Sequence, residues 1–239
     1  MGAGGFGIVI ACRDRSSDKK FALKIAAQYH AHASSSLRKE RAILSEMSHP
    51  NIIRVYEMRR EYKNLVIMKM ELGKETITSF VERHQRRTGE EGLPEEQCAK
   101  VMKGLFRALA YLHDEQNVIH RDIKPDNLII GSHKDLTRVK LVDFGLAVQD
   151  SLEKITDFAK CGTFLYKPPE QVTNIFAYAK KADTWAAGII MFYMLTGRHP
   201  IWKEGINKLQ MEQMMKNFKE LELPDSMSPK AKHLISCLC

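Results

Sequence analysis

The sequence predicts an α+β fold in which strands dominate the first part of the chain and long helices dominate the rest. Short alternating apolar runs at residues 8–11 and 21–25 are typical of strands. Residues 95–113 carry an apolar stripe at helical spacing, and residues 183–195 are apolar all round, which predicts a buried helix. With 239 residues, the chain can form one large domain or two small lobes that share a cleft.

A polar loop between two apolar, strand-like runs carries the clearest chemistry. Residues 120–127 read His-Arg-Asp-Ile-Lys-Pro-Asp-Asn. Phosphoryl transfer to a hydroxyl needs a carboxylate to orient the hydroxyl, a cation beside the phosphoryl group and an oxygen ligand for magnesium. Asp122, Lys124 and Asn127 supply these groups, and Asp-Phe-Gly follows at residues 143–145. The alternative is a polar surface loop without a catalytic role. The further motifs described below make this alternative much less favoured.

A glycine-rich segment near the start of the chain is suited to binding phosphates. Residues 2–9 follow the spacing G-x-G-x-x-G-x-V. A hairpin with few side chains lets backbone N–H groups approach phosphate oxygens. A dinucleotide-binding turn has similar spacing but leads into a helix, whereas here a predicted strand follows. The sequence therefore favours a nucleotide-binding hairpin.

One lysine and one glutamate stand at positions where burial would force them to pair. Lys24 lies among apolar neighbours in a predicted strand, although it could instead extend from a sheet edge into solvent. Glu40 falls on the apolar face of a helix for which serines 34–36 offer an N-cap. A buried carboxylate needs a cation, so we expect Glu40 to pair with Lys24, the alternative being a flanking arginine.

In this order, the glycine-rich segment, the lysine strand, the His-Arg-Asp loop and the Asp-Phe-Gly triplet resemble the eukaryotic protein kinase domain. The resemblance covers the chain from end to end. It implies a bilobal fold, with a small β-rich lobe with one main helix over about residues 1–71 and a hinge and larger, mainly helical lobe over about residues 72–239. It places ATP and Mg²⁺ between the lobes. Lys124, two positions after Asp122, resembles the serine/threonine branch rather than the tyrosine branch.

The resemblance also implies a role for each matching residue. Asp122 would orient the substrate hydroxyl and accept its proton, and Asn127 and Asp143 would bind magnesium. Lys124 would neutralise the γ-phosphate, and Lys24 would hold the α- and β-phosphates. The implied catalytic set is Asp122, Lys124, Asn127, Lys24 and Glu40, and the implied nucleotide-binding set is Gly2, Gly4, Gly5, Phe6, Gly7, Val9, Ala22, Lys24, Met70, Glu71, Leu72, Ile129 and Asp143.

The hinge between the lobes is expected where residues 64–72 end. By resemblance, Met70 would guard the pocket behind adenine, and the backbone of residues 71–73 would hydrogen-bond the base. A register two places earlier, with Met68 and Lys69 in these positions, fits as well.

Residues 145–169 show little periodicity and match an activation segment. We predict Thr156 as its phosphorylation site, modified by an upstream kinase or by the protein itself, because Arg121 can pair with a phosphorylated loop residue. Thr163 would instead contact the catalytic Asp and Lys. Asp183, at the start of the apolar helix, would anchor the backbone of the loop at residues 120–127, which corresponds to the catalytic loop of the kinase family.

The family pattern departs from this sequence near both ends. Residues 167–170 read Lys-Pro-Pro-Glu, whereas protein kinases have Ala-Pro-Glu at the end of this segment. The Arg that usually pairs with the Glu of this motif, here Glu170, would lie beyond Cys239. Residues 228–239 resemble the penultimate helix, so the final helix is expected to be absent. The strand that precedes the glycine-rich loop in kin is also short here.

Composition limits the remaining function classes. Lys and Arg exceed Asp and Glu by 37 to 29, giving a net charge of +8, but no basic run is long enough for a nucleic-acid arm. The basic surface could attract acidic partners, although a solvated exterior is the favoured explanation. No signal peptide opens the chain, and its longest apolar stretch is too short to span a membrane. Five scattered cysteines fit a reducing compartment, so we expect a cytoplasmic protein, with the nucleus as the alternative.

The sequence thus predicts an ATP- and Mg²⁺-dependent kinase that phosphorylates Ser or Thr hydroxyls of protein substrates. The alternative is a pseudokinase or binding scaffold, a hypothesis based on the two short ends. A nucleotide-binding metabolic enzyme with a small-molecule acceptor is a third possibility. The subfamily, the activator and the substrate are not encoded in any motif of this sequence.

Overall fold

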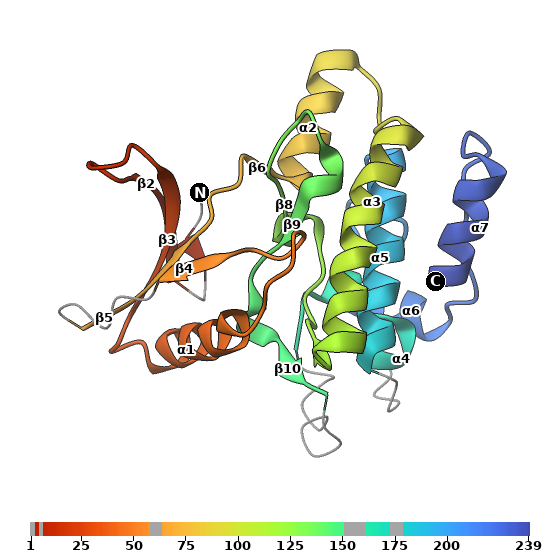
Figure 1. Cartoon of the computed structure of the whole chain (residues 1–239). Helices are drawn as coiled ribbons and strands as arrows, with labels where there is room; N and C mark the ends of the chain where they lie inside the picture. The colour runs from red at the N-terminus through yellow and green to blue at the C-terminus, as the bar shows by residue number, and fades with distance from the viewer. Residues whose placement is uncertain (1–2, 5–6, 58–63, 151–160, 173–178) are drawn as a thin grey trace.

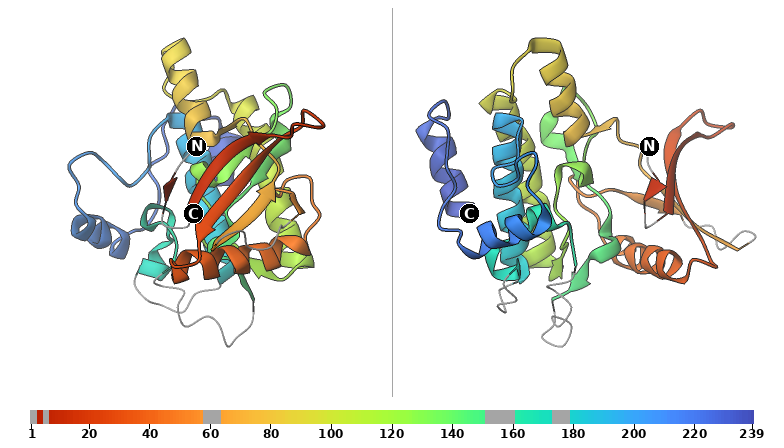
Figure 2. Two further views of the ribbon diagram at one scale, coloured as in Figure 1. Left: turned by 90° about the vertical axis from the view of Figure 1, so that its left-hand side faces the viewer. Right: turned by 180° about the vertical axis from the view of Figure 1, so that it is seen from behind.

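The protein has a β-rich part and a larger helical part, as the sequence predicts (Figure 1). Figure 2 shows the sheet at one end of the molecule and the C-terminal helix at the other. No helix in the described part of the chain is long and apolar enough to cross a membrane. The computed structural model describes residues 3–4, 7–57, 64–150, 161–172 and 179–239.

The β-rich part is built around an antiparallel sheet in which β3 lies at the centre. Val9 pairs with Lys24 across β2 and β3, and Ala22 pairs with Met70 across β3 and β5. On β3 and β5 alternate residues are buried, as expected for strands with one face against a core. The strands, in sheet order, are β1 (Ala3–Gly4), β2 (Gly7–Arg13), β3 (Lys20–Ala27), β5 (Leu65–Met70) and β4 (Val55–Glu57).

Helix α1 (Ala31–Ser45) packs beside this sheet and turns Leu37, Glu40 and Leu44 inward, as predicted. The predicted N-cap in the serines is wrong, because the helix begins at Ala31 and His30 precedes it without a side-chain cap. Ser36 lies inside the helix and is buried, and its hydroxyl donates to Gly145 O (3.1 Å). A serine that finds a distant acceptor need not cap its own helix.

Two small sheets frame the catalytic loop. In the first, β8 (Leu128–Ile130) lies between β6 (Glu75–Thr76) and β9 (Val139–Leu141). In the second, β7 (Val118–Ile119) pairs with β10 (Val148–Gln149). The predicted strands on both sides of the loop are therefore present, and each is anchored by a different partner strand.

The helical part is organised around α5 (Ala179–Thr196), which is largely buried, as its apolar composition predicts. The helix begins one turn before Asp183, where its start was predicted. This extra turn contains Lys180, whose ammonium donates to His113 O (2.8 Å) and Asn117 Oδ1 (2.9 Å) and so ties the turn to the rest of the structure. The other helices are α2 (Ile77–Thr88), α3 (Glu95–Ala110) with a π-helical turn at Tyr111–Glu115, α4 (Pro169–Val172), α6 (Lys208–Lys216) and α7 (Pro229–Leu238).

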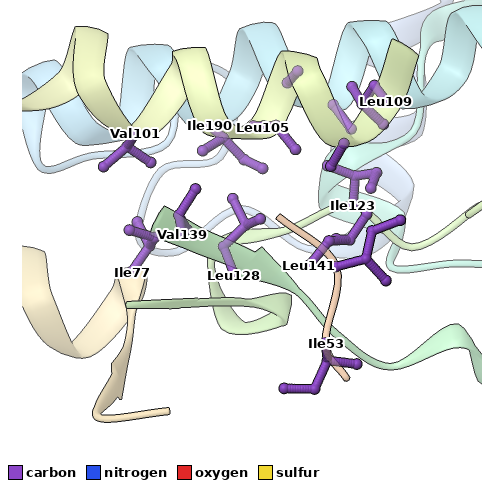
Figure 3. Packing of buried hydrophobic residues seen from close by; sticks show 14 of the residues in the cluster. Ile53, Ile77, Val101, Leu105, Leu109, Ile123, Leu128, Val139, Leu141 and Ile190 are labelled. Carbon is purple, nitrogen blue, oxygen red and sulfur yellow. The ribbon is translucent and has the colours of Figure 1, made fainter. Parts of the chain in front are cut away.

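The core joins α3 and α5 to the sheet of β8 and β9, directly beneath the catalytic loop (Figure 3). Ile52 also bridges Leu141, which connects the segment before β4 to β9. Close packing of this kind holds the loop ends in place. The residues labelled in Figure 3 are Ile53, Ile77, Val101, Leu105, Leu109, Ile123, Leu128, Val139, Leu141 and Ile190.

Candidate active site

Three charged side chains from distant parts of the chain meet between the two parts of the molecule. The Nζ atom of Lys24 on β3 lies 2.6 Å from Glu40 Oε2 on α1 and 2.8 Å from Asp143 Oδ1. Lys24 and Glu40 are buried, whereas Asp143 is partly exposed. The predicted pairing of Lys24 with Glu40 is therefore confirmed, and Asp143 joins it.

The charge on Lys24 is stabilised by this arrangement. Burial alone would favour the neutral amine, but the two carboxylates outweigh it and raise the pKa of Lys24. An ammonium held in place by two carboxylates has its remaining N–H donor pre-oriented. It is suited to binding an anionic oxygen.

The backbone around Asp143 fixes the direction of its carboxylate. Asp143 has a left-handed conformation (φ 63°), and a short 3₁₀ turn follows at Phe144–Leu146. The Phe144 N–H donates to Glu40 Oε1 (3.2 Å), and the Phe144 ring is fully buried. Glu40 therefore holds both the lysine and the backbone of the Asp-Phe-Gly triplet.

A second cluster surrounds Asp122 in the catalytic loop. Asp122 Oδ2 lies 2.8 Å from Lys124 Nζ and accepts from Asn127 Nδ2 (3.0 Å). Asp122 Oδ1 accepts from the Thr163 backbone N–H (2.9 Å) and from its hydroxyl (2.7 Å). Lys124 Nζ also lies 2.8 Å from Thr163 Oγ1, so the predicted contacts of Thr163 are confirmed.

These contacts keep Asp122 ionised. Its burial favours the neutral acid, but hydrogen bonds from Lys124 and Thr163 and the charge of Lys124 outweigh this and lower the pKa of Asp122. A carboxylate that is ionised at neutral pH can accept a hydrogen bond from an incoming hydroxyl.

His120 connects the two clusters. Its Nδ1 accepts from the Asp122 N–H (3.3 Å), and its Nε2 lies 3.0 Å from Val142 O. The His120 ring also meets the Phe144 ring edge-on, with centroids 4.7 Å apart. A ring that accepts at Nδ1 and donates at Nε2 is neutral, and burial accordingly lowers the pKa of His120. His120 therefore serves as a structural link between the two clusters.

Asp183 anchors the catalytic loop to α5, as predicted. Its Oδ2 and Oδ1 atoms accept the backbone N–H groups of His120 and Arg121, each at 2.9 Å. Arg121 has a left-handed backbone (φ 66°), so these bonds fix a strained turn. His113, which was not predicted to take part, also lies 2.9 Å from Asp183 Oδ2 through its Nε2 atom. Its position at the end of a helix gave no indication of this contact.

Several residues expected to bind nucleotide lie near the charged triad in the sheet. Val9 pairs with Lys24 and is half-buried, and Ala22 is buried. Gly4 pairs with Gly7 in the β1–β2 hairpin. Leu72 is half-buried against the core. Gly2, Gly5 and Phe6 lie outside the described residues.

The hinge register stays a prediction. Met68 and Met70 are both buried on the same face of β5, because side chains alternate along a strand. Met70 ends the strand, and the Glu71 N–H then donates to Arg54 O (2.9 Å). A β-carbon added to Gly73 would lie 1.7 Å from Ile129 Cγ2, so the segment after β5 runs directly over Ile129.

The predicted phosphorylation site Thr156 lies outside the described residues. The Nε atom of Arg121 donates to Leu146 O (2.6 Å), immediately after the Asp-Phe-Gly triplet. This places Arg121 beside the start of the activation segment.

Two oxygen atoms are left to bind a cation. Asn127 uses its amide nitrogen for Asp122 O (2.8 Å) and Asp122 Oδ2, and its Oδ1 accepts no hydrogen bond in the described part of the chain. Asp143 uses Oδ1 for Lys24, which leaves Oδ2. Carboxylate and amide oxygens are ligands that magnesium accepts, so these residues fit the ion that the fold implies.

Comparison with known proteins decides the family. The model of the protein kinase domain matches residues 1–239. The chain belongs to the protein kinase domain family. The kinase domain is 35% identical over 246 residues to serine/threonine-protein kinase DCLK2 of Rattus norvegicus, covering 99% of this chain and 30% of that protein.

Two further relatives carry the name calcium/calmodulin-dependent protein kinase type II. The alpha chain from Drosophila melanogaster is 30% identical over 241 residues, which cover 99% of this kinase domain and 44% of the relative. The protein from Caenorhabditis briggsae is 31% identical over 244 residues, covering 100% and 44%. The kinase domain thus spans less than half the length of these curated relatives.

Proposed function

We propose that this kinase domain transfers the γ-phosphoryl group of Mg-ATP to Ser or Thr hydroxyls of protein substrates. The observation that carries the proposal is the double contact of Lys24 with Glu40 and Asp143, beside a separate cluster that keeps Asp122 ionised. Together they provide a cation for phosphates, oxygen ligands for a metal and a base for the acceptor hydroxyl.

Each residue has a role that its contacts support. Bound Mg-ATP supplies the phosphoryl group and the metal charge that stabilises its transfer. Lys24, oriented by Glu40, holds phosphate oxygens, and Asp143 and Asn127 provide metal ligands. The β1–β2 hairpin would hold the nucleotide phosphates, and the segment after Met70 would hydrogen-bond its base.

Asp122 orients the acceptor hydroxyl and accepts its proton. Lys124 contacts both Asp122 and Thr163, and these contacts support a role for its positive charge in neutralising the transferred phosphoryl group. This arrangement acts through positioning and through charges fixed before the reaction, and not through a covalent intermediate.

The acceptor is proposed to be a protein Ser or Thr. Lys124 follows Asp122 at the spacing of the serine/threonine branch, and one relative is named a serine/threonine-protein kinase. We place the nucleotide between a small lobe of about residues 1–71 and a larger lobe of about residues 72–239.

The test compares phosphate incorporation into a generic basic protein by four purified chains. The wild type and Asp225→Asn, an exposed control of the same charge change, are expected to incorporate phosphate equally. Asp143→Ala and Asp122→Asn are expected to lose at least about 100-fold in rate. Phosphoamino-acid analysis should show phosphoserine or phosphothreonine only.

Equal phosphate incorporation by the wild type and Asp143→Ala would contradict the proposal that this domain is an active kinase. A binding scaffold would instead show a rise in melting temperature with Mg-ATP but no transfer. Measuring both therefore separates an active kinase from a pseudokinase.

A further inference from the structure

A concave basic pocket lies on the helical part, apart from the catalytic residues. It has a volume of about 320 Å³ and is formed by α2, α3 and the segment that follows β8. None of the described Asp or Glu residues lines it. Its lining consists of Phe80, Arg83, His84, Arg87, Gln97, Lys100, His133, Lys134 and Leu136.

The pocket has a rigid, partly aromatic base. Phe80, His84 and Leu136 are each more than nine-tenths buried. The Arg83 guanidinium stacks 5.2 Å above the centre of the Phe80 ring, and the His133 ring lies 6.1 Å from it. Side chains held by packing and stacking lose little freedom when a ligand binds.

Carboxylates around the pocket neutralise only part of its charge. Glu75 pairs with Arg83 (2.7 Å) and with His133 (2.6 Å), and Glu90 pairs with His84 (3.0 Å).

Glu96 pairs with Lys100 (2.7 Å), but both side chains are exposed, so this pair is weak. Arg87 and Lys134 have no carboxylate partner within the described residues. The side chains of Arg87 and Lys134 therefore carry positive charges that no ion pair among the described residues offsets.

Gln97, which is partly buried, contributes its side-chain amide to the same wall. Its Oε1 is buried and has no hydrogen-bond partner in the part of the chain that the structure describes. Rotation of the amide would exchange this oxygen for an N–H donor that an anion can satisfy.

The chemistry favours a phosphomonoester over a single carboxylate. A phosphomonoester carries a charge of about −1.5 to −2 and three acceptor oxygens at neutral pH. Guanidinium, ammonium and amide donors that converge from several sides match those oxygens better than the two oxygens of a carboxylate. The volume fits a phosphorylated side chain and little more.

We propose that this basic pocket binds a phosphoserine or phosphothreonine side chain of a protein partner. The pocket is open at the surface, and its free cations Arg87 and Lys134 are exposed, so a polypeptide can reach them. None of its residues belongs to the catalytic set, so the site goes beyond the proposed transfer reaction.

The experiment measures binding of a fluorescent, glycine- and serine-rich peptide with one central phosphoserine. Its unphosphorylated form and inorganic phosphate serve as comparison ligands. The double variant Arg87→Gln/Lys134→Gln is compared with Arg86→Gln/Lys103→Gln, which removes the same charge from exposed positions on α2 and α3 outside the pocket.

We expect the phosphopeptide to bind at least about tenfold more tightly than the unphosphorylated peptide and than inorganic phosphate. The pocket variant should lose at least about tenfold in affinity, and the control variant less than about twofold. Asp143→Ala should bind the phosphopeptide like the wild type, so failure of the transfer reaction does not affect this test.

Three results would overturn the proposal. One is equal binding of the phosphorylated and unphosphorylated peptides. Another is equal weakening by the pocket and control variants, which would indicate only the net charge. The third is inorganic phosphate binding as tightly as the phosphopeptide, which would make the pocket a site for the free ion.

Discussion

At the scale of single residues, Thr163 shows how a neighbour sets the protonation of the proposed base. Its N–H and its hydroxyl both donate to the same oxygen of Asp122. Hydrogen bonds to the ionised form of an acid lower its pKa, and removing one should raise it.

Replacing Thr163 by Ala is therefore expected to raise the pKa of Asp122 toward that of an ordinary aspartate. Activity that needs ionised Asp122 would then begin to fall at a higher pH as the solution is acidified. The measurement is kcat/KM against pH. Thr163→Ser keeps the hydroxyl and should retain the wild-type profile, and identical acid limbs for all three proteins would contradict the role given to Thr163.

Among single residues, the Lys24–Glu40 pair could be predicted as the favoured alternative, because burial of either charged group requires an opposite charge nearby. Glu40 stands on an apolar helix face, and Lys24 stands in an apolar strand. The same reasoning failed for Ser36, because a serine has acceptors both locally and far along the chain. Its bond to Gly145 O depends on tertiary structure that no local pattern contains.

At the scale of elements, the end of α5 is fixed by the loop between α2 and α3. Gly197 terminates α5 with a left-handed backbone (φ 70°). A β-carbon there would lie 2.0 Å from Glu91 O and 2.2 Å from Gln85 Nε2. Leu93 N–H also donates to Met194 O (2.7 Å), so the two segments are in direct contact.

Gly197→Ala is expected to cost about 3 kcal/mol or more of unfolding free energy, from backbone strain and from the clash with Glu91 O. Gly89 is a matched control, because it is also left-handed (φ 76°) but a β-carbon there would meet nothing within 4 Å. Gly89→Ala should cost about 1 kcal/mol. Urea unfolding measures both, and equal losses would mean that contact with the loop is unimportant.

Element types could be predicted better than their ends. The helices 95–113 and 183–195 and the strands around the catalytic loop were recognisable because apolar periodicity reports burial directly. The start of α5 was missed, because the contacts of Lys180 with His113 and Asn117 join segments far apart in sequence. The hinge register could not be chosen from the sequence because Met68 and Met70 both lie on the buried face of β5.

At the scale of the whole molecule, two neutral histidines, one buried and one partly buried, connect elements that are distant in sequence. His120 joins the catalytic loop to the Asp-Phe-Gly region, and His199 joins the segment after α5 to the activation segment through Leu165 O (2.8 Å). Burial lowers the pKa of His120, and it lowers that of His199 to about 4. In mild acid these two histidines therefore stay neutral in the folded protein, whereas they become protonated in the unfolded chain.

This difference predicts that the protein loses stability in mild acid. Below the unfolded pKa of about 6.5, the unfolded chain binds a proton that folded His199 binds only near pH 4, so stability falls as pH falls through this window. Between about pH 7.5 and 5.5, His199 should account for a loss of roughly 1 to 1.5 kcal/mol of unfolding free energy. The free energy of unfolding is measured in urea at both pH values. His199→Gln should show a correspondingly smaller decrease than the wild type between them, because its amide does not titrate. An equal loss in both proteins would show that His199 is already protonated, or exposed, in the folded state.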